Sequence, residues 1–525
     1  MQLTSRGILY FALKENGDDS LKHSFMFIQV YTFFCTEQQY STKTALQVAT
    51  VDRHDNADLM IHSTEVSTGA NHRELSSLDT SLPATSYFRK INVDNKANWS
   101  GRNRNLLAPC EILVGVSVSI NDYGDVVAVG GIYASDTYYS SVAQVFKLDE
   151  TSGGWVQVGN YIDEPLFLPK SSFLEDARAE VSLSGDGKRL AIATLKSDRD
   201  GNPNSSSAYG TVVVYEHALV NLTEEWNVLE YAYNGTAGGG GTYMGMKVSL
   251  DETGQRLAIG ERYHDVDENT NSADDRGRVM VYNVTSQEPM HIIAGEYGGH
   301  FIGSSVMISG DGSCLVYGAP GSDINGTNSG AASVYCLDSG SGAWTQRGSD
   351  LKGEAEGDEY GFSVAITYNG DYVAVGARLA DSEDKIDTGH ARVFAYNQAI
   401  DAYSQLGGDI DGEEGTRNSL GKYYVGDSSG YSVAMSYDSD QGLLKVIIGA
   451  PNNQDAGYYK GHIRLFSFKT STSTSSNPSS WTQVGDDIDG IEDNESYGQN
   501  VAMSSSGTRI VVSSQSFSCS ETNGY

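Results

Sequence analysis

A set of three short apolar or alternating runs recurs along most of this chain. In the copy from Trp344 to Tyr396 the runs read FSVAIT, YVAVGA and ARVFAY, and Gly-rich or acidic turns separate them. Runs of this length and period predict half-buried and buried β-strands. A unit of this kind cannot bury both of its faces alone, so it must stack against copies of itself.

Two marker positions define the copies. The first run begins next to a glycine in all copies but one, at Gly115, Arg178, Gly245, Gly303, Gly361, Gly430 and Gly498. A fourth run begins at an aromatic residue, at Trp99, Trp155, Trp226, Trp344, Tyr403 and Trp481. All five tryptophans of the protein occupy this one position, which is typical of a residue with a structural role in each repeat.

The number of runs predicts how the two ends of the chain meet. After Gly498 the chain supplies a first and a second run and stops at Tyr525, while Tyr87–Trp99 upstream resembles a third run leading into a fourth. We therefore predict an all-β fold, a seven-bladed β-propeller of four-stranded antiparallel blades. Its last blade is closed by N- and C-terminal strands together, with Tyr87–Trp99 pairing with Ile510–Ser514, and this closure removes two exposed sheet edges.

The prediction divides the chain into three parts. Residues 1–85 form a non-repeat leader, 86–517 form the propeller and 518–525 form a C-terminal tail. Within the leader, Phe25–Cys35 has the apolar character of a secretion signal but lacks a positively charged start. It is interpreted either as such a signal or as a buried or disordered apolar patch. The rest of the leader is rich in Ser, Thr and Gln and is predicted to be flexible.

The formal net charge of −33 limits the classes of partner. Affinity for nucleic acid comes from cationic side chains on phosphate, so nucleic acid is disfavoured as a partner, and so are anionic membrane surfaces. No apolar run reaches the length of a membrane span, so we expect no membrane insertion. The acidity suits solubility or cation binding, and we expect a monomeric propeller.

The sequons favour an extracellular or cell-surface location, and the cysteines offer one disulfide candidate. Five cysteines are too few for a disulfide scaffold. Cys314 opens a second run and Cys336 closes the third run of the same copy, so antiparallel pairing makes them a disulfide candidate. The alternative is two small core residues. Glycosylation candidates in Asn-x-Ser/Thr sequons are Asn98, Asn204, Asn221, Asn234, Asn283, Asn325 and Asn494.

Strand direction sorts the loops by side. The connections from second to third strand and from fourth strand to the next first strand emerge together, and we call this side the loop-rich face. The long acidic loops all belong to it, so function is expected there. Alternating Asp and Asn residues offer several oxygens to one point, which makes Ca²⁺ the candidate cofactor, against the alternative of solvated acidic loops. The metal candidates are Asp265, Asp267, Asn269, Asn271 and Asp274, then Asp409, Asp411 and Glu413, then Asp487, Asp489 and Glu492.

The sequence gives little support for catalysis. HExxH does not occur, and the ten histidines are scattered without a zinc-like spacing. We therefore expect no catalytic residue and a protein that is not an enzyme.

The repeat unit resembles FG-GAP-like repeats, the blades of integrin α-subunit propellers. The matching segments are Tyr360-Gly361 and Tyr497-Gly498, then Gly318-Ala319-Pro320 and Gly449-Ala450-Pro451, and the WxQxGxDIxG-type segments that start at Trp344 and Trp481. The resemblance implies a propeller and a role in extracellular recognition or adhesion. Integrin calcium loops lie between first and second strands, where these turns are too short, so those metal sites are not carried over.

Two functions of different classes follow. The leading hypothesis is a non-enzymatic recognition or adhesion propeller that binds protein or glycan through its acidic loop-rich face. The alternative is a polysaccharide hydrolase or lyase that uses carboxylates of the same face. An enzyme needs polar groups that converge on a central funnel, whereas a binding surface spreads aromatic and charged groups over the loop rims.

Overall fold

The computed structural model describes a chain whose regular elements are all β-strands. Five strands are described near the N-terminus: β1 (Thr4–Tyr10), β2 (Phe25–Tyr31), β3 (Lys43–Arg53), β4 (Leu59–Ser63) and β5 (Phe88–Asp94). Beyond them the structure describes residues 112–518, except 135–137, 160, 164–167, 170–177, 196–209, 221–222, 236–243, 266–273, 287, 383–384, 414, 418–423, 471–479 and 492. Within these ranges no helix has the length and hydropathy needed to cross a membrane.

The first three blades follow one another along the chain. Blade 1 contains β6 (Ile112–Ile120), β7 (Val126–Ala134), β8 (Tyr138–Asp149), β9 (Gly154–Gln157), β10 (Ile162–Asp163) and β11 (Leu168–Pro169). Blade 2 contains β12 (Ala179–Leu183), β13 (Arg189–Thr194), β14 (Thr211–Val220) and β15 (Thr223–Asn234). Blade 3 contains β16 (Lys247–Leu250), β17 (Arg256–Glu261), β18 (Arg278–Asn283) and β19 (Pro289–Ala294).

The next three blades have a fourth strand that is split into two short pieces. Blade 4 contains β20 (Ser305–Ile308), β21 (Cys314–Ala319), β22 (Ala331–Leu337), β23 (Trp344–Gln346) and β24 (Leu351–Lys352). Blade 5 contains β25 (Tyr360–Ile366), β26 (Tyr372–Ala377), β27 (His390–Asn397), β28 (Ala402–Gln405) and β29 (Ile410–Asp411). Blade 6 contains β32 (Ser432–Asp438), β33 (Leu443–Ala450), β34 (His462–Lys469), β35 (Thr482–Gln483) and β36 (Ile488–Asp489), and a separate hairpin joins β30 (Gly415–Arg417) to β31 (Tyr424–Gly426).

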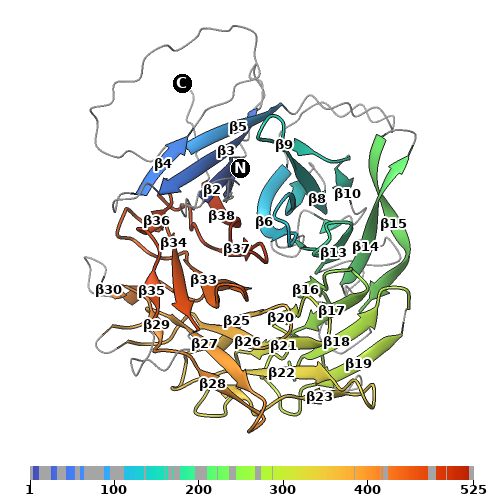
Figure 1. Ribbon diagram of the computed structural model, residues 1–525, viewed down its shortest axis with the longest axis vertical. Helices are drawn as coiled ribbons and strands as arrows, with labels where there is room; N and C mark the ends of the chain where they lie inside the picture. Colours follow the sequence, from blue (N-terminus) through green and yellow to red (C-terminus); the bar gives the residue numbers. More distant parts are fainter. Residues whose placement is uncertain are drawn as a thin grey trace, which may run out of the picture.

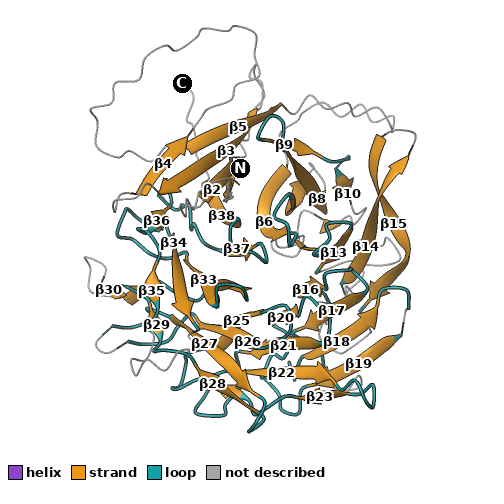
Figure 2. Cartoon of the chain, in the orientation of Figure 1, coloured by secondary structure: helices purple, strands orange, loops and turns teal. Residues whose placement is uncertain are grey.

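The described blades form a ring, with their first strands innermost (Figure 1). Every described pairing within a blade is antiparallel, and among the described residues no helix covers the sheets (Figure 2). The all-β propeller of four-stranded antiparallel blades is therefore confirmed, but the number of seven is wrong. The described part of the chain forms six such blades. The strands β37 (Asn500–Met503) and β38 (Ile510–Ser518) lie in a smaller sheet of three strands, with β1 as the third.

The predicted closure of a last blade by Tyr87–Trp99 is also wrong. The strand β5 of that segment pairs with β3, in a separate sheet of β2, β3, β4 and β5, and not with Ile510–Ser514. The β1 strand takes the position beside β38, with Ile8 opposite Ser514. Alternating polar and apolar residues show that a segment suits a sheet, but they do not specify which free edge it joins. Of the predicted 1–85 leader, the structure describes four strands, and β2 covers much of Phe25–Cys35.

Glycines and serines of the inner strands join neighbouring blades. Ser305 Oγ donates to the carbonyl of Gly361 at 2.8 Å, and Ser363 and Ser432 donate in the same way to Gly430 and Gly498. A Cβ added to Gly318 would lie 1.8 Å from the carbonyl oxygen of Gly361. The paired aromatic-Gly and Gly-Ala-Pro segments therefore mark the place where two blades approach too closely for any side chain.

The core lies between the blades. The interface of blades 4 and 5 contains Val316, Val334, Val364, Val373 and Val375, each at most 8% exposed. The repeat aromatics lie on the fourth strands or directly before them. Trp155 and Trp344 are buried, and Trp226, Tyr403 and Trp481 are half-buried, whereas Trp99 lies outside the described residues. Trp481 Nε1 donates to the carbonyl of Leu406 in the preceding blade at 2.8 Å.

Candidate functional site

The loop-rich face is built from pairs of loops in blades 3 to 6. Backbone bridges join the two loops of each pair, at Gly277 with Ile302, Gly330 with Tyr360, Gly389 with Ser429, and Gly461 with Tyr497. In each of the four pairs, both loops contain a non-glycine residue with φ between 47° and 57° close to the bridge. These residues are Asp275 and Phe301, Asn328 and Glu359, Asp387 and Ser428, and Tyr459 and Ser496. Such conformations cost of order 1–3 kcal/mol each and persist only where the surroundings hold them, so this rim is preorganised.

Buried carboxylates fix these loops by accepting backbone N–H groups. Asp358 Oδ2 accepts from Ala355 N at 2.8 Å, and Asp427 Oδ2 accepts from Glu413 N at 2.6 Å. Asp265 Oδ1 accepts from the N–H groups of Asp274 and Asp275, both at 2.8 Å. Because their oxygens serve the backbone, we interpret these acids as structural caps of the loops.

A cluster of charged and titratable side chains lies at this edge of blade 5. His390 opens β27 and stands opposite Asp411 at the end of β29. Arg392, two residues along β27, donates from Nε to Asp409 Oδ1 at 3.0 Å and from Nη2 to Asp409 Oδ2 at 2.9 Å. One nitrogen of His390 and one carboxylate oxygen each of Asp409 and Asp411 lie within 4.8 Å of one another. We call these three residues the blade 5 cluster.

Blade 6 repeats the arrangement and adds a residue from blade 5. His462 opens β34 and stands opposite Asp489 at the end of β36. A nitrogen of His462 and carboxylate oxygens of Glu413 and Asp487 lie within 4.8 Å of one another. Arg464 Nη1 lies 3.3 Å from Glu413 Oε1. We call Glu413, His462 and Asp487 the blade 6 cluster.

Both arginines also receive a glutamate from the preceding blade. Arg392 Nη2 lies 2.5 Å from Glu354 Oε2 of blade 4, as Arg464 contacts Glu413 of blade 5. The repeated unit is therefore His-x-Arg on the third strand, Asp-Ile-Asp on the fourth strand and Glu from the neighbour. Blade 4 lacks it, because Ala331 and Ser333 occupy the positions of the histidine and arginine.

The two histidines are buried among these charges. His462 is 1% exposed and His390 is 4% exposed. Burial, assisted by Arg464 and Arg392 respectively, lowers the pKa of each from 6.5 to about 4, so both rings are neutral near pH 7. Burial and Asp487 raise the pKa of Asp489. The electrostatic environment thus combines neutral imidazoles with crowded carboxylates.

The structure brings some of the predicted metal candidates together and leaves others apart. Asp409, Asp411, Glu413, Asp487 and Asp489 come together at the edges of blades 5 and 6. The set around Asp265 does not converge in the described part of the chain, because Asp265 caps a loop and Asp274 Oδ2 pairs with Arg276 at 2.9 Å. Asp267, Asn269, Asn271 and Glu492 lie outside the described residues.

Sequence reasoning missed the histidines and arginines of both clusters. The signal was present, because HARVF and HIRLF open the third runs of two consecutive copies, and each is followed by Asp-Ile-Asp-Gly. Repeats of a polar pattern at one structural position place the residues at the same edge of each blade. A search for zinc-like spacing within one segment could not find groups contributed by different strands.

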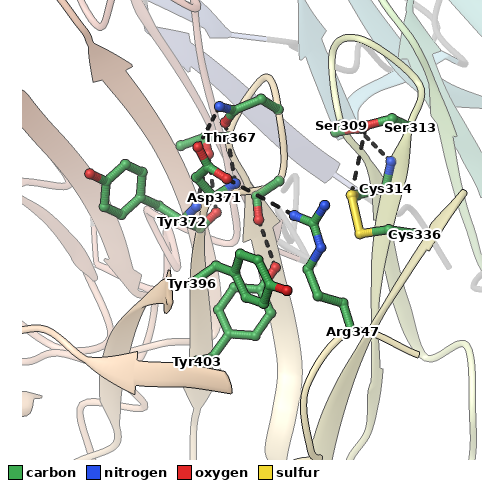
Figure 3. Close-up of polar contacts among 12 residues, drawn as sticks. Ser309, Ser313, Cys314, Cys336, Arg347, Thr367, Asp371, Tyr372, Tyr396 and Tyr403 are labelled. Atoms are coloured by element: carbon green, nitrogen blue, oxygen red, sulfur yellow. Dashed lines mark hydrogen bonds and ion pairs between the residues drawn. A yellow bond between two sulfur atoms is a disulfide. The ribbon is translucent and has the colours of Figure 1, made fainter. Parts of the chain in front are cut away.

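Cys314 and Cys336 are joined by a disulfide, from directly opposite positions on β21 and β22 (Figure 3). Figure 3 also shows Arg347 beside Tyr396 and Asp371, with its guanidinium carbon 4.5 Å from the tyrosine ring centre. Of the sequons, Asn283, Asn325 and Asn494 are exposed and Asn234 is half-buried, while Asn98, Asn204 and Asn221 lie outside the described residues.

A central channel of about 920 Å³ runs between the inner strands. Two pairs of polar side chains meet at its wall: Lys247 Nζ lies 2.7 Å from Glu180 Oε1, and Tyr368 Oη donates to Glu252 Oε2 at 2.8 Å. Asp122 lies in the turn after β6, where burial, Glu252 and Asp186 raise its pKa to about 6. Among the described lining residues there is no histidine and no cysteine.

Comparison with known proteins finds distant structural likenesses and shows no family. No family model and no curated protein matches the sequence. The structure is similar to a periplasmic gluconolactonase, PpgL, from Pseudomonas aeruginosa, at 13% identity and a TM-score of 0.43, over 93% of this chain and 97% of that chain. It is also similar to Sqt1 from Chaetomium thermophilum, at 12% identity and a TM-score of 0.40, over 77% and 96%.

A third similar structure is a prolyl endopeptidase, at 12% identity and a TM-score of 0.39, over 86% of this chain. The chain spans 50% of that endopeptidase. None of these likenesses shows that the chain belongs to the FG-GAP family. All of them are too distant to carry an argument about activity, so the function is argued from the residues.

Proposed function

We propose that this protein is a non-enzymatic recognition propeller that binds a protein or glycan ligand through its loop-rich face, outside the cell or at its surface. The observation that carries the proposal is the spread of exposed apolar side chains over this face. They are Tyr297, Ile324, Ile386, Tyr458 and Ile491, which are 38% to 63% exposed and come from loops of blades 3 to 6. Tyrosines among charged groups on a rigid rim are typical of binding surfaces.

The same face carries the two His–carboxylate clusters, so polar and apolar groups share it. A catalytic site needs two or three polar groups that converge on a pocket, and none of the six cluster residues lines the central channel. Among the charged side chains that line the central channel, Lys247 and Glu180 form an ion pair at 2.7 Å. This distribution favours recognition over the polysaccharide hydrolase or lyase alternative.

The extracellular location is supported by independent observations. Structural disulfides persist in oxidising compartments, and Cys314–Cys336 is buried in the sheet of blade 4. The exposed sequons at Asn283, Asn325 and Asn494 accommodate glycans at the surface.

The test is a screen of the secreted protein against glycan and extracellular-protein arrays, followed by matched tyrosine variants. Tyr458 is 57% exposed on the loop-rich face, and Tyr123 is 68% exposed in a turn on the opposite face. We expect Y458A to weaken binding by about tenfold or more and Y123A to leave it unchanged, because aromatic anchors dominate interface energies.

Three results would overturn the proposal. One is the absence of any ligand on either array. Another is an equal loss of binding in Y123A and Y458A. The third is the release of cleaved sugar from a polysaccharide panel, which would establish the enzymatic alternative.

A further inference from the structure

We propose that the blade 5 cluster and the blade 6 cluster are two sites for a divalent transition-metal ion of the Zn²⁺, Co²⁺ and Ni²⁺ class. His462, Asp487 and Glu413 supply one site, and His390, Asp409 and Asp411 supply the other. The inference goes beyond the proposed function, because a ligand could bind the loop-rich face with or without metal.

The donor atoms favour this class of ion over Ca²⁺. Each cluster offers one imidazole nitrogen and two carboxylate oxygens within 4.8 Å of one another. Neutral imidazole is a common ligand of Zn²⁺, Co²⁺ and Ni²⁺, whereas Ca²⁺ takes six to eight oxygens. Three protein ligands leave room for water or a further ligand in the fourth position of a tetrahedral ion.

The burial of the histidines is an independent indication of a missing ligand. His462 is 1% exposed, and neither of its ring nitrogens has a hydrogen-bond partner. His390 is 4% exposed, and its Nε2 has no partner. A buried polar atom without a partner costs about 1–3 kcal/mol, so native proteins supply a partner or an ion. A metal ion bound among the carboxylates would give one ring nitrogen of each histidine a partner.

The surrounding charge also favours a cation. Glu413, Asp487, Asp455 and Asp489 face Arg464 and Lys460 around the blade 6 cluster. Asp409, Asp411 and Glu354 face Arg392 and Arg464 around the blade 5 cluster. The carboxylates outnumber the cationic side chains in both, so a divalent ion reduces the excess negative charge.

The two sites should differ in affinity. Arg392 engages both oxygens of Asp409, at 3.0 and 2.9 Å, and so competes with a metal ion. In blade 6 the corresponding Asp487 instead accepts from Gln483 Nε2 at 2.6 Å, while Arg464 contacts Glu413 at 3.3 Å. We therefore expect the blade 6 cluster to bind more tightly.

Blade 4 shows that the backbone does not require the histidine. Ala331 stands opposite Lys352 in the register that His390 and Asp411 use in blade 5. Ser333 Oγ donates to Asp350 Oδ1 at 2.7 Å where blade 5 has the Arg392–Asp409 pair. A histidine-to-alanine change in blade 5 or 6 thus copies a residue that the same fold already accepts.

The experiment is titration calorimetry of the tag-free, chelator-treated full chain with ZnCl₂, and separately with CaCl₂, supported by Co²⁺ absorption spectra. We expect two Zn²⁺ equivalents in the wild type. H462A should lose the tighter one, H390A the weaker one, and the double variant should bind at least tenfold more weakly. H300A is the matched control, because His300 lies on the same face beside Glu296 and Asp323 but outside both clusters.

Identical Zn²⁺ titrations of the wild type and the double variant would overturn the proposal. So would an H300A loss equal to that of H462A, or Ca²⁺ binding as tight as Zn²⁺ binding. If H462A does not fold, D487N provides the second test, since it keeps the side-chain shape and removes one ligand charge. A folded D487N that retains both Zn²⁺ equivalents at wild-type affinity would contradict the blade 6 site.

Discussion

At the scale of single residues, the Cys314–Cys336 disulfide is the clearest stabilising device in the described chain. It closes a segment of 22 residues. Closing a loop of this length reduces the conformational entropy of the unfolded chain, which stabilises the folded protein by about 3 kcal/mol.

We expect dithiothreitol to lower the urea midpoint of the wild-type protein, because reduction restores that freedom to the unfolded chain. The measurement is denaturation followed by tryptophan fluorescence, with and without reductant. A C314A/C336A variant should show the lower midpoint under both conditions. A reductant effect of the same size in that variant would contradict the assignment.

Asp122 predicts a pH dependence of stability. Because burial, Glu252 and Asp186 raise its pKa from 3.8 to about 6, the folded chain holds a proton between these values that the unfolded chain has released. The free energy of unfolding therefore falls as the pH rises through this window, because the folded chain must ionise Asp122 in a buried site. The destabilisation by Asp122 is complete above pH 6.

D122N should accordingly raise the melting temperature at pH 7.5, by roughly 1–2 °C for a chain of this size, and change it little at pH 4. Melting curves by circular dichroism would show the difference. The opposite sign is expected for D338N, because backbone N–H groups of Ser341 and Gly340 lower the pKa of Asp338. A D122N effect that is equal at both pH values would be inconsistent with the titration.

At the scale of strands and loops, the contact between blades at Gly361 is the most restrictive. Its φ is +88°, and an added Cβ would lie 2.2 Å from the carbonyl oxygen of Ala331. Gly357 has a φ of +90°, but a Cβ added there would have no atom within 4 Å. An alanine at Gly357 therefore introduces backbone strain alone, whereas an alanine at Gly361 introduces the same strain and a steric clash.

G357A should therefore lower the free energy of unfolding by about 1 kcal/mol, because alanine is less stable than glycine in the left-handed conformation. G361A should cost several times more, because two blades must move apart. The comparison of chemical denaturation curves for the two variants checks this. An equal decrease in the free energy of unfolding for both variants would mean that the close approach of the blades does not limit which side chain fits at Gly361.

The sequence predicted the strands of each blade well, because every run repeats in several copies with the same buried pattern. Val373, Val375 and Phe394 illustrate this, since their spacing alone places them on strands. It also singled out Asp411 and Asp489, but as loop residues, whereas the structure places them on the short strands β29 and β36. It could not predict that Asp409 would pair with Arg392, or that His462 would join Glu413 of another blade, because such contacts depend on the register of strands from different segments.

At the scale of the whole molecule, the ring passes from blade 6 to blade 1 through the small sheet of β37, β38 and β1. Asn500 Nδ2 donates to the carbonyl of Val116 at 2.9 Å, and Ser505 Oγ donates to the carbonyl of Asp122 at 3.0 Å. The predicted closure, which rested on the number of repeat copies, was wrong because the last sheet contains β1, a strand whose sequence does not share the repeat pattern.

N500A should weaken this junction by about 1 kcal/mol, the typical value of one hydrogen bond. We expect amide hydrogen exchange to accelerate together in β37 and β6, while β20 to β22 stay protected. N397A is the control, since Asn397 bonds only locally to Ala399 N at 3.0 Å. Faster exchange spread evenly over all blades would argue against a local junction.

The closest contacts between blades use backbone carbonyls, glycines and serines of inner strands, whereas the His, Arg and Asp residues of blades 5 and 6 lie at the ends of third and fourth strands. Each arginine there contacts one glutamate of the preceding blade, Glu354 for Arg392 and Glu413 for Arg464. Blade 4 carries Ala331, Ser333 and Lys352 at the equivalent positions and keeps the same architecture. The chemistry of one wedge can thus be rewritten by changing its own strand ends and a single residue of its neighbour, so a ligand specificity could be grafted onto this scaffold one sector at a time.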